Sequence, residues 1–150
     1  MKEITIDYAL RATWQAVSKM YNEEAKKFNA TMAAGFTLLS IDPKTGTPST
    51  ALGPKMGMEA TSLSRILKSM EEKGFIRRKP NPEDGRGVLI HLTALGLQKR
   101  EDSKSAVFRF NDTVKKNISE EKLKNFYEVI DTINKLITEK NIYSKDIATN

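Results

Sequence analysis

Residues 59–93 read EATSLSRILKSMEEKGFIRRKPNPEDGRGVLIHLT, and this stretch decides the fold of the chain. In its first half, apolar side chains recur at intervals of three and four residues: Leu63, Ile66, Leu67 and Met70. This spacing predicts an amphipathic helix that begins at Glu59 and runs for about 15 residues. Gly74 then stands where the end of a helix favours a residue in the left-handed conformation.

The outward face of this predicted helix carries side chains that can contact DNA. They are short hydroxyls and long cations, the types that reach base edges and phosphates: Thr61, Ser62, Ser64, Arg65 and Lys68. On an isolated amphipathic helix, the same residues would simply form a solvated face. A turn before the helix and a basic hairpin after it favour the DNA-reading interpretation.

Two short runs of strand type follow the helix, at residues 75–79 and 88–92. A segment rich in Pro, Asn, Asp and Gly separates them, which predicts a β-hairpin. Side chains alternate between the faces of a strand, so Arg77 and Lys79 share one face and Arg78 takes the other. We expect Arg77 and Lys79 to face DNA. A helix followed by a basic hairpin predicts a winged helix-turn-helix.

The tip of the hairpin contains two residues of opposite charge. Arg86 is expected to enter the minor groove, because narrow A·T segments attract a guanidinium group. Asp84 would repel phosphates, so its expected task is to orient Arg86 through a charge-assisted hydrogen bond. The alternative for both residues is an ordinary solvated turn.

Residues 73–86, KGFIRRKPNPEDGR, together with HLT at residues 91–93, resemble the wing signature of MarR-family transcriptional regulators. The family pattern is Asp-x-Arg, a short strand, and then Leu-Thr at the start of the next helix. The matching residues in this chain are Asp84, Arg86, Leu92 and Thr93. The run SLSR at residues 62–65 is similar to the recognition helix of the family. Gly85 departs from the pattern, since many members carry a further Arg at that position.

The resemblance implies a homodimer that binds a pseudo-palindromic operator in double-stranded DNA, with half-sites about 10 bp apart. It also implies a small effector, often aromatic, that binds between a DNA-binding lobe and a dimerisation lobe. Candidate wall residues for such an effector are Trp14, Met32 and Phe36; packing in the core or in the dimer is the alternative for Trp14. A repressor is the expected kind of regulator, and activation stays open.

The sequence before residue 59 predicts three further helices. Apolar residues repeat at helical spacing over residues 5–29 and 31–41. Residues 49–56 are expected to be the first helix of the helix-turn-helix, with Ser49 as its N-cap. Pro54 fits poorly inside that helix, which should therefore be short, bent or restarted at the proline.

After the hairpin, Thr93 is expected to cap a long connecting helix and Ser119 to cap a last helix. The apolar face of the last helix is wider than the chain's own core requires, which predicts a dimer. We therefore expect a mainly α chain with a small β-hairpin wing (α+β). One domain would cover residues 1–150, with a winged helix-turn-helix lobe at about 31–93 and a dimerisation lobe at about 5–30 and 94–141.

The charge of the chain favours a polyanionic partner, either nucleic acid or an anionic membrane surface. The 150 residues carry a formal net charge of +6, and the pI is about 9.5. Residues 55–86 hold eight Lys or Arg and five Asp or Glu, so 8 − 5 = +3, which is half of the excess. This concentration around the predicted helix and hairpin favours DNA.

Several other classes of protein are disfavoured. The chain has no cysteine and one histidine, His91, so we expect no metal site, no catalytic residues and no cofactor. No apolar run is long enough to span a bilayer, so a cytoplasmic protein without a membrane partner is expected. The alternative function is a winged-helix protein-interaction module, or a ligand-binding module without operator recognition.

Overall fold

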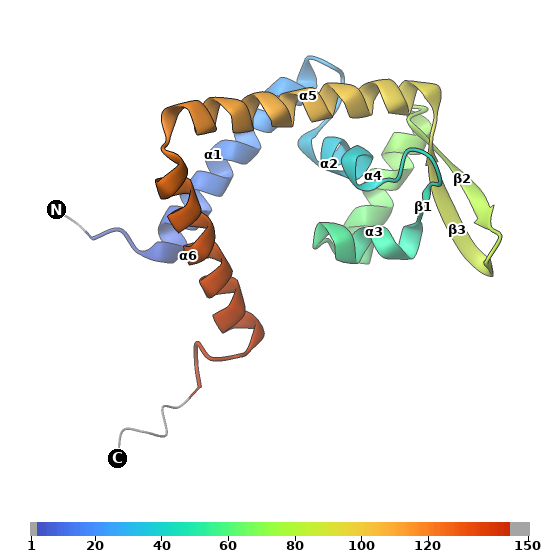
Figure 1. Cartoon of the computed structure of the whole chain (residues 1–150). Coiled ribbons are helices and arrows are strands. Elements are labelled where there is room, and N and C mark those ends of the chain that lie inside the picture. The colour runs from blue at the N-terminus through green and yellow to red at the C-terminus, as the bar shows by residue number, and fades with distance from the viewer. Residues whose placement is uncertain (1–2, 145–150) are drawn as a thin grey trace. The chain divides into compact units, whose positions relative to one another are not determined.

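The computed structural model describes residues 3–144, apart from the side chain of Arg86 (Figure 1). These residues form six helices and one three-stranded antiparallel sheet, so the predicted mainly α fold with a β-hairpin wing is confirmed. The chain divides into two compact units, Met1–Val107 and Phe108–Asn150. The first unit contains the sheet and the helices around it, and the second contains the last helix.

Two helices open the first unit, α1 (Ile6–Lys26) and α2 (Met32–Ser40). Each begins after a threonine, Thr5 or Thr31, whose hydroxyl accepts a hydrogen bond from a backbone N–H of the first turn. Helix α1 ends three residues before its predicted end at residue 29. The chain turns there through Asn29, whose φ of 57° is incompatible with a continuing helix.

The helix-turn-helix begins with β1 (Thr47–Pro48) and α3 (Ser49–Met56). The sequence did not predict β1, because a two-residue strand has no periodicity to detect. The prediction that Ser49 is the N-cap of α3 was wrong: Pro48 occupies that position and no side chain caps the helix. Helix α3 is short and continues through Pro54, so it does not restart there.

The recognition helix is α4 (Ala60–Glu72), and Gly57 forms the turn before it with a φ of 65°. Gly74 follows α4 with a φ of 77°, as its position after the helix predicts. The apolar stripe of α4 is buried in the core of the first unit. Each fully buried Leu, Ile, Phe or Met side chain contributes about 1.5–3 kcal/mol to folding. The buried apolar residues are Ala34, Leu38, Ile41, Leu52, Leu63, Leu67, Met70, Phe75, Ile76, Ile90 and Leu92.

The wing consists of β2 (Ile76–Asn81) and β3 (Asp84–Leu92), joined by a turn at Pro82 and Glu83. Both strands are longer than predicted, because the pairing continues through the segment that was expected to be a loop. The register shifts after Pro80, where the strand pairing is interrupted near the tip. In the sheet, β3 lies between β1 and β2 (Figure 1).

Helix α5 (Ala94–Asn117) follows the wing directly. The hydroxyl of Thr93 accepts a hydrogen bond from the N–H of Gly96 at 3.0 Å, which confirms the predicted cap. Helix α6 (Glu120–Thr138) begins after Ser119, whose hydroxyl accepts from the N–H of Lys122 at 3.3 Å, as predicted. None of the residues of α6 is buried, although the helix carries a long apolar face.

Candidate nucleic-acid interface

The outward face of α4 is the first element of the interface. The five side chains of this face that are predicted to contact DNA are all exposed: Thr61, Ser62, Ser64, Arg65 and Lys68. The helix buries Leu63, Leu67 and Met70, which fixes its rotation about its own axis. The opposite face is therefore exposed to solvent. A helix of 13 residues is about 20 Å long and fits the major groove of B-DNA.

The start of α4 has no side-chain cap, unlike the starts of α1, α2 and α6. Glu59 occupies the N-cap position, and its side chain makes no capping hydrogen bond. Its backbone carbonyl accepts the first intrahelical hydrogen bond, from Leu63 at 3.0 Å. The first backbone N–H groups of α4 therefore lack the side-chain acceptor that Thr5, Thr31 and Ser119 give to α1, α2 and α6.

The cationic strand β2 is the second element. Arg77 and Lys79 are exposed, and pairing places them opposite His91 and Leu89 of β3. The Nε of Arg78 lies 3.3 Å from a carboxylate oxygen of Glu71. An exposed ion pair of this kind contributes about 0–1 kcal/mol. The contact places the side chain of Arg78 against the end of α4.

The tip of the wing is ordered by a local turn. The side-chain oxygen of Asn81 accepts a hydrogen bond from the N–H of Glu83 at 3.0 Å. The carboxylate of Asp84 lies over Gly87, where an added Cβ would be 3.2 Å from its oxygen. Arg86 belongs to β3, but its side chain lies outside the described residues. Its pairing with Asp84 and its entry into the minor groove stay predictions.

Phe75 connects the recognition helix, the wing and α5. Its N–H donates to the carbonyl of Met70 at 2.9 Å, and its carbonyl accepts from the N–H of Thr93 at 3.0 Å. The hydroxyl of Thr93 also donates to the carbonyls of Gly74 and Phe75. A Cβ on Gly96 would lie 1.9 Å from the carbonyl oxygen of Phe75. Sequence reasoning missed this junction, although a glycine inside the first turn of a helix is a signal of close backbone approach.

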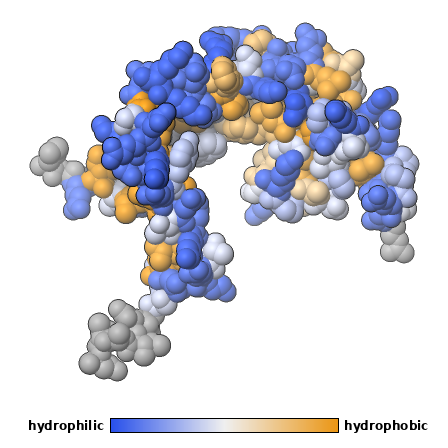
Figure 2. Space-filling view, in the orientation of Figure 1, coloured by the Kyte–Doolittle hydropathy of each residue, from blue (hydrophilic) through white to orange (hydrophobic). Residues whose placement is uncertain are grey.

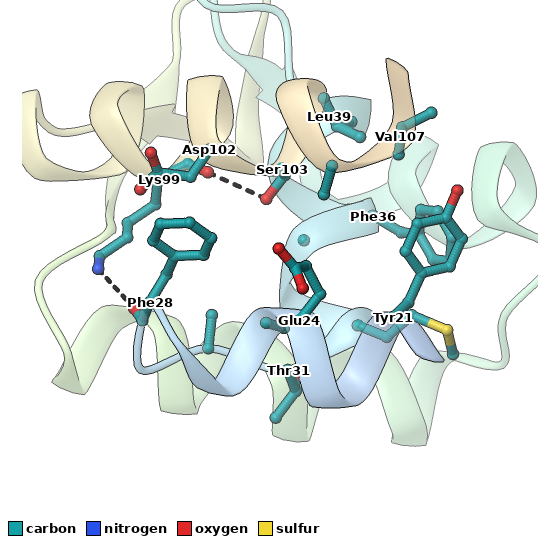
Figure 3. A pocket seen from close by; sticks show the side chains of 15 residues that line it. Tyr21, Glu24, Phe28, Thr31, Phe36, Leu39, Lys99, Asp102, Ser103 and Val107 are labelled. Atoms are coloured by element: carbon teal, nitrogen blue, oxygen red, sulfur yellow. Dashed lines mark hydrogen bonds between the residues drawn. The ribbon is translucent and has the colours of Figure 1, made fainter. Parts of the chain in front are cut away.

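A hollow that is open to solvent lies behind α2 within the first unit (Figure 3). It is formed by α1, α2, the loop between them and α5. Of the predicted effector contacts, Met32 and Phe36 line it, whereas Trp14 does not and is 54% exposed on α1. The lining residues are Tyr21, Glu24, Ala25, Phe28, Ala30, Thr31, Met32, Gly35, Phe36, Leu39, Lys99, Asp102, Ser103, Ala106 and Val107.

Aromatic side chains give the hollow its apolar walls. The rings of Tyr21 and Phe36 meet edge to face, with centroids 5.7 Å apart. Burial raises the pKa of the Tyr21 hydroxyl above its usual value, so this phenol stays neutral at physiological pH. The sequence did not assign Tyr21, Phe28 or Lys99 to an effector site, because these residues come together only after folding.

Among residues 3–144, no three His, Asp or Glu side chains gather in a way that could hold a metal ion. None of the helices in that range is both long and apolar enough to cross a membrane.

The buried stripe of α4, the exposed polar face beside it and the antiparallel hairpin that follows define a winged helix-turn-helix protein. Residues 30–88 match the model of the MarR family. The chain is similar to this family over the residues that hold the recognition helix and most of the wing.

Relatives and solved structures are similar to the chain as well. The uncharacterized HTH-type transcriptional regulator YdgJ of Bacillus subtilis is 33% identical over 79 residues, which are 53% of this chain and 48% of the relative. The organic hydroperoxide resistance transcriptional regulator of the same organism is 31% identical over 94 residues, 63% of this chain and 64% of the relative. The chain thus spans about half to two thirds of these curated relatives.

The whole fold also has solved counterparts. A crystal structure of a Staphylococcus aureus MepR–DNA complex superposes with a TM-score of 0.82 at 21% identity, over 90% of this chain and 99% of that one. The PcaV transcriptional regulator from Streptomyces coelicolor, in complex with its natural ligand, gives a TM-score of 0.75 at 17% identity, over 90% and 98%. At these identities, the likeness shows a common fold.

Proposed function

We propose that this protein is a transcriptional regulator that binds a specific double-stranded DNA operator as a homodimer. One observation carries the proposal: all five hydroxyl and cationic residues of the predicted reading face of α4 are exposed. Hydroxyls and an arginine at the start of such a helix can bond base edges, and the cations after them can bond phosphates. The exposed cations of β2 lie on the element that follows the helix.

The distribution of charge supports binding to a polyanion. Half of the net charge of +6 falls within residues 55–86, which contain α4 and most of the wing. Cations that neutralise phosphates release counterions, so operator affinity should fall steeply as salt rises. Asp84 and Glu59 limit this attraction locally, which favours contacts at defined positions over uniform phosphate binding.

The apolar surface of α6 supports a homodimer. Phe126, Tyr127, Val129 and Ile137 are each more than half exposed in the single chain. Figure 2 shows this apolar surface as orange patches among the hydrophilic side chains of α6. A second copy of the chain would cover it, as expected for regulators that bind two half-sites.

The hollow behind α2 supports regulation by a small aromatic effector, because the aromatic walls of the hollow suit a flat apolar ring. The PcaV regulator was solved in complex with its natural ligand. On this proposal the protein is not an enzyme and acts as a repressor, and its bacterial relatives would place it in the cytoplasm. The relatives are named as transcriptional regulators rather than as enzymes.

The test is selection of bound duplexes from a random pool, followed by salt titrations on a selected and a random duplex. We expect affinity for both to fall with salt, and a preference of roughly 10³-fold or more for the selected duplex. Equal affinity for both duplexes would refute operator recognition and favour a winged-helix module that binds another partner. Sedimentation at micromolar concentration that shows a stable monomer would refute the homodimer.

A further inference from the structure

We propose that Arg78 binds the sugar–phosphate strand that separates the major groove from the adjacent minor groove, and that Glu71 positions its guanidinium group for this contact. The inference rests on the proposed function, because it concerns the same DNA interface. It adds a contact on the face of β2 opposite the predicted contacts Arg77 and Lys79. All of these residues belong to the first compact unit.

Strand pairing places Arg78 on the face of the sheet that packs against the helices. Residues that pair across two strands share a face, and Arg78 pairs with Ile90, which is fully buried. Ile76, two residues before Arg78 on the same face, is 2% exposed. The side chain of Arg78 is itself 38% exposed. Arg78 therefore continues the buried face of the sheet to the point where that face leaves the core beside α4.

Helix α4 meets Arg78 along one stripe of its exposed surface. Ser64, Lys68 and Glu71 follow one another at intervals of four and three residues, and all three are exposed. Ser64 and Lys68 belong to the predicted DNA-reading face. Glu71 ends the stripe, and Arg78 lies against it. The stripe thus leads from the predicted DNA contacts of α4 to the wing.

The geometry of B-DNA brings a phosphate strand to this place. A single sugar–phosphate strand separates each major groove from the neighbouring minor groove. The proposed function places α4 in the major groove, and the predicted entry of Arg86 places the tip of the wing in the minor groove. The strand between the two grooves then crosses the protein where α4 and β2 adjoin, and Arg78 is the cation of β2 on that side.

The ion pair with Glu71 leaves most of the guanidinium group available. The Nε of Arg78 lies 3.3 Å from a carboxylate oxygen of Glu71. Among the residues that the structure describes, the side chain of Arg78 makes no other ion pair or hydrogen bond. Its two terminal nitrogens can therefore donate to two oxygens of one phosphate, the bidentate geometry that arginine favours. Glu71 holds the side chain toward α4 by Nε alone.

Duplexes in which one phosphate at a time is replaced by a neutral methylphosphonate test the contact. The parent duplex is the one selected from the random pool, and fluorescence anisotropy measures affinity. For the wild type, replacement of a phosphate between the two grooves should weaken binding about fivefold or more. Arg78→Met should abolish this loss at one position in each half-site. It should also reduce the salt dependence of log affinity by about one for each protomer.

Two further variants serve as controls for charge. Lys44→Met removes the same charge from an exposed position in the loop before β1, at the opposite edge of the sheet from β2. It should keep the wild-type loss at every replaced phosphate. Arg78→Lys keeps the charge without the two-pronged geometry, so it should restore the salt dependence and show a smaller loss. A wild-type pattern of losses in Arg78→Met would overturn the proposal.

Glu71 is tested through the phosphate that depends on Arg78. Glu71→Ala should reduce the loss at that phosphate, because nothing then holds the guanidinium group in place. Glu71→Gln keeps an oxygen that can accept a hydrogen bond from Nε, so it should preserve the loss. Both variants remove the same negative charge, and a general change in attraction to DNA would affect them equally. Equal losses in the two variants would overturn the positioning role of Glu71.

The outcomes also separate this inference from the proposed function. If no duplex is selected from the random pool, the proposed function fails. If a duplex is selected but no phosphate position depends on Arg78, the inference fails and the function stands. If Arg77→Met abolishes the loss between the grooves and Arg78→Met does not, the wing meets DNA with its other face, and the inference is likewise overturned.

Discussion

Helices α4 and α6 have the same kind of amphipathic sequence but opposite surroundings. In α4, Leu63, Leu67 and Met70 are at most 4% exposed, because α2, α3 and the sheet cover them. In α6, no residue is buried, and Ile137 is 59% exposed. An apolar stripe therefore shows that a helix needs a partner, while the identity of that partner depends on the rest of the chain.

The largest expected effect tests this difference directly. Leu67→Ala should lower the free energy of unfolding by about 2–5 kcal/mol, because it opens a cavity in a covered core. Urea denaturation should show this loss at every protein concentration. Ile137→Ala should lower the free energy of unfolding only slightly at low protein concentration, where the chain is a monomer. The loss should grow at high concentration, because only a dimer would cover that side chain. If Ile137→Ala lowered the free energy of unfolding equally at every protein concentration, the contrast between a covered α4 and an uncovered α6 would be contradicted.

The second prediction concerns the junction that supports the covered helix. Gly96→Ala should destabilise the fold by about 1–3 kcal/mol or more, because its Cβ would lie 1.9 Å from the carbonyl oxygen of Phe75. Gly85→Ala is the matched control, since an added Cβ there meets no atom within 4 Å. Thermal unfolding of both variants measures the difference. Equal melting temperatures would show that the junction can relax without cost.

Much of this architecture could be predicted from the sequence. The spacing of Leu63, Leu67 and Met70 placed both the core side and the outward face of α4. Ser119 and Thr93 marked helix starts correctly, since a side-chain cap depends on neighbours within one turn. The alternation of side chains predicted only that Arg78 lies opposite Arg77 and Lys79, and its pairing with Glu71 was not anticipated.

The parts that could not be predicted depend on distant segments. Strand β1 exists because Thr47 and Pro48 pair with Ile90 and Leu89, more than 40 residues later in the chain. The hollow behind α2 combines residues of α1 and α5, and no local pattern in either helix indicates their meeting. Trp14 was a candidate wall residue for an effector because its side chain is aromatic, but it does not line that hollow.

The third prediction tests the free face of α4. Arg65→Ala should weaken binding to the selected operator by about 1–3 kcal/mol, roughly 5- to 150-fold, if its guanidinium bonds a base edge or clamps a phosphate. Lys124→Ala removes the same charge from an exposed position on α6 and is the control. Anisotropy titrations at fixed salt compare the two. Similar small losses for both would mean that Arg65 acts only through net charge.

The smallest expected effect comes from the caps of the two helices. Ser119→Ala should cost about 0.5–2 kcal/mol, because it removes the acceptor for the N–H of Lys122 at the start of α6. At the start of α4, Glu59 makes no such bond, so Glu59→Ser should stabilise the fold by up to about 1 kcal/mol. Urea denaturation measures both changes. If Glu59→Ser is more stable yet binds the operator less selectively, then the uncapped start of α4 serves DNA recognition. If selectivity is unchanged, Glu59 has no part in reading the operator, and the contrast between the helices is one of capping alone.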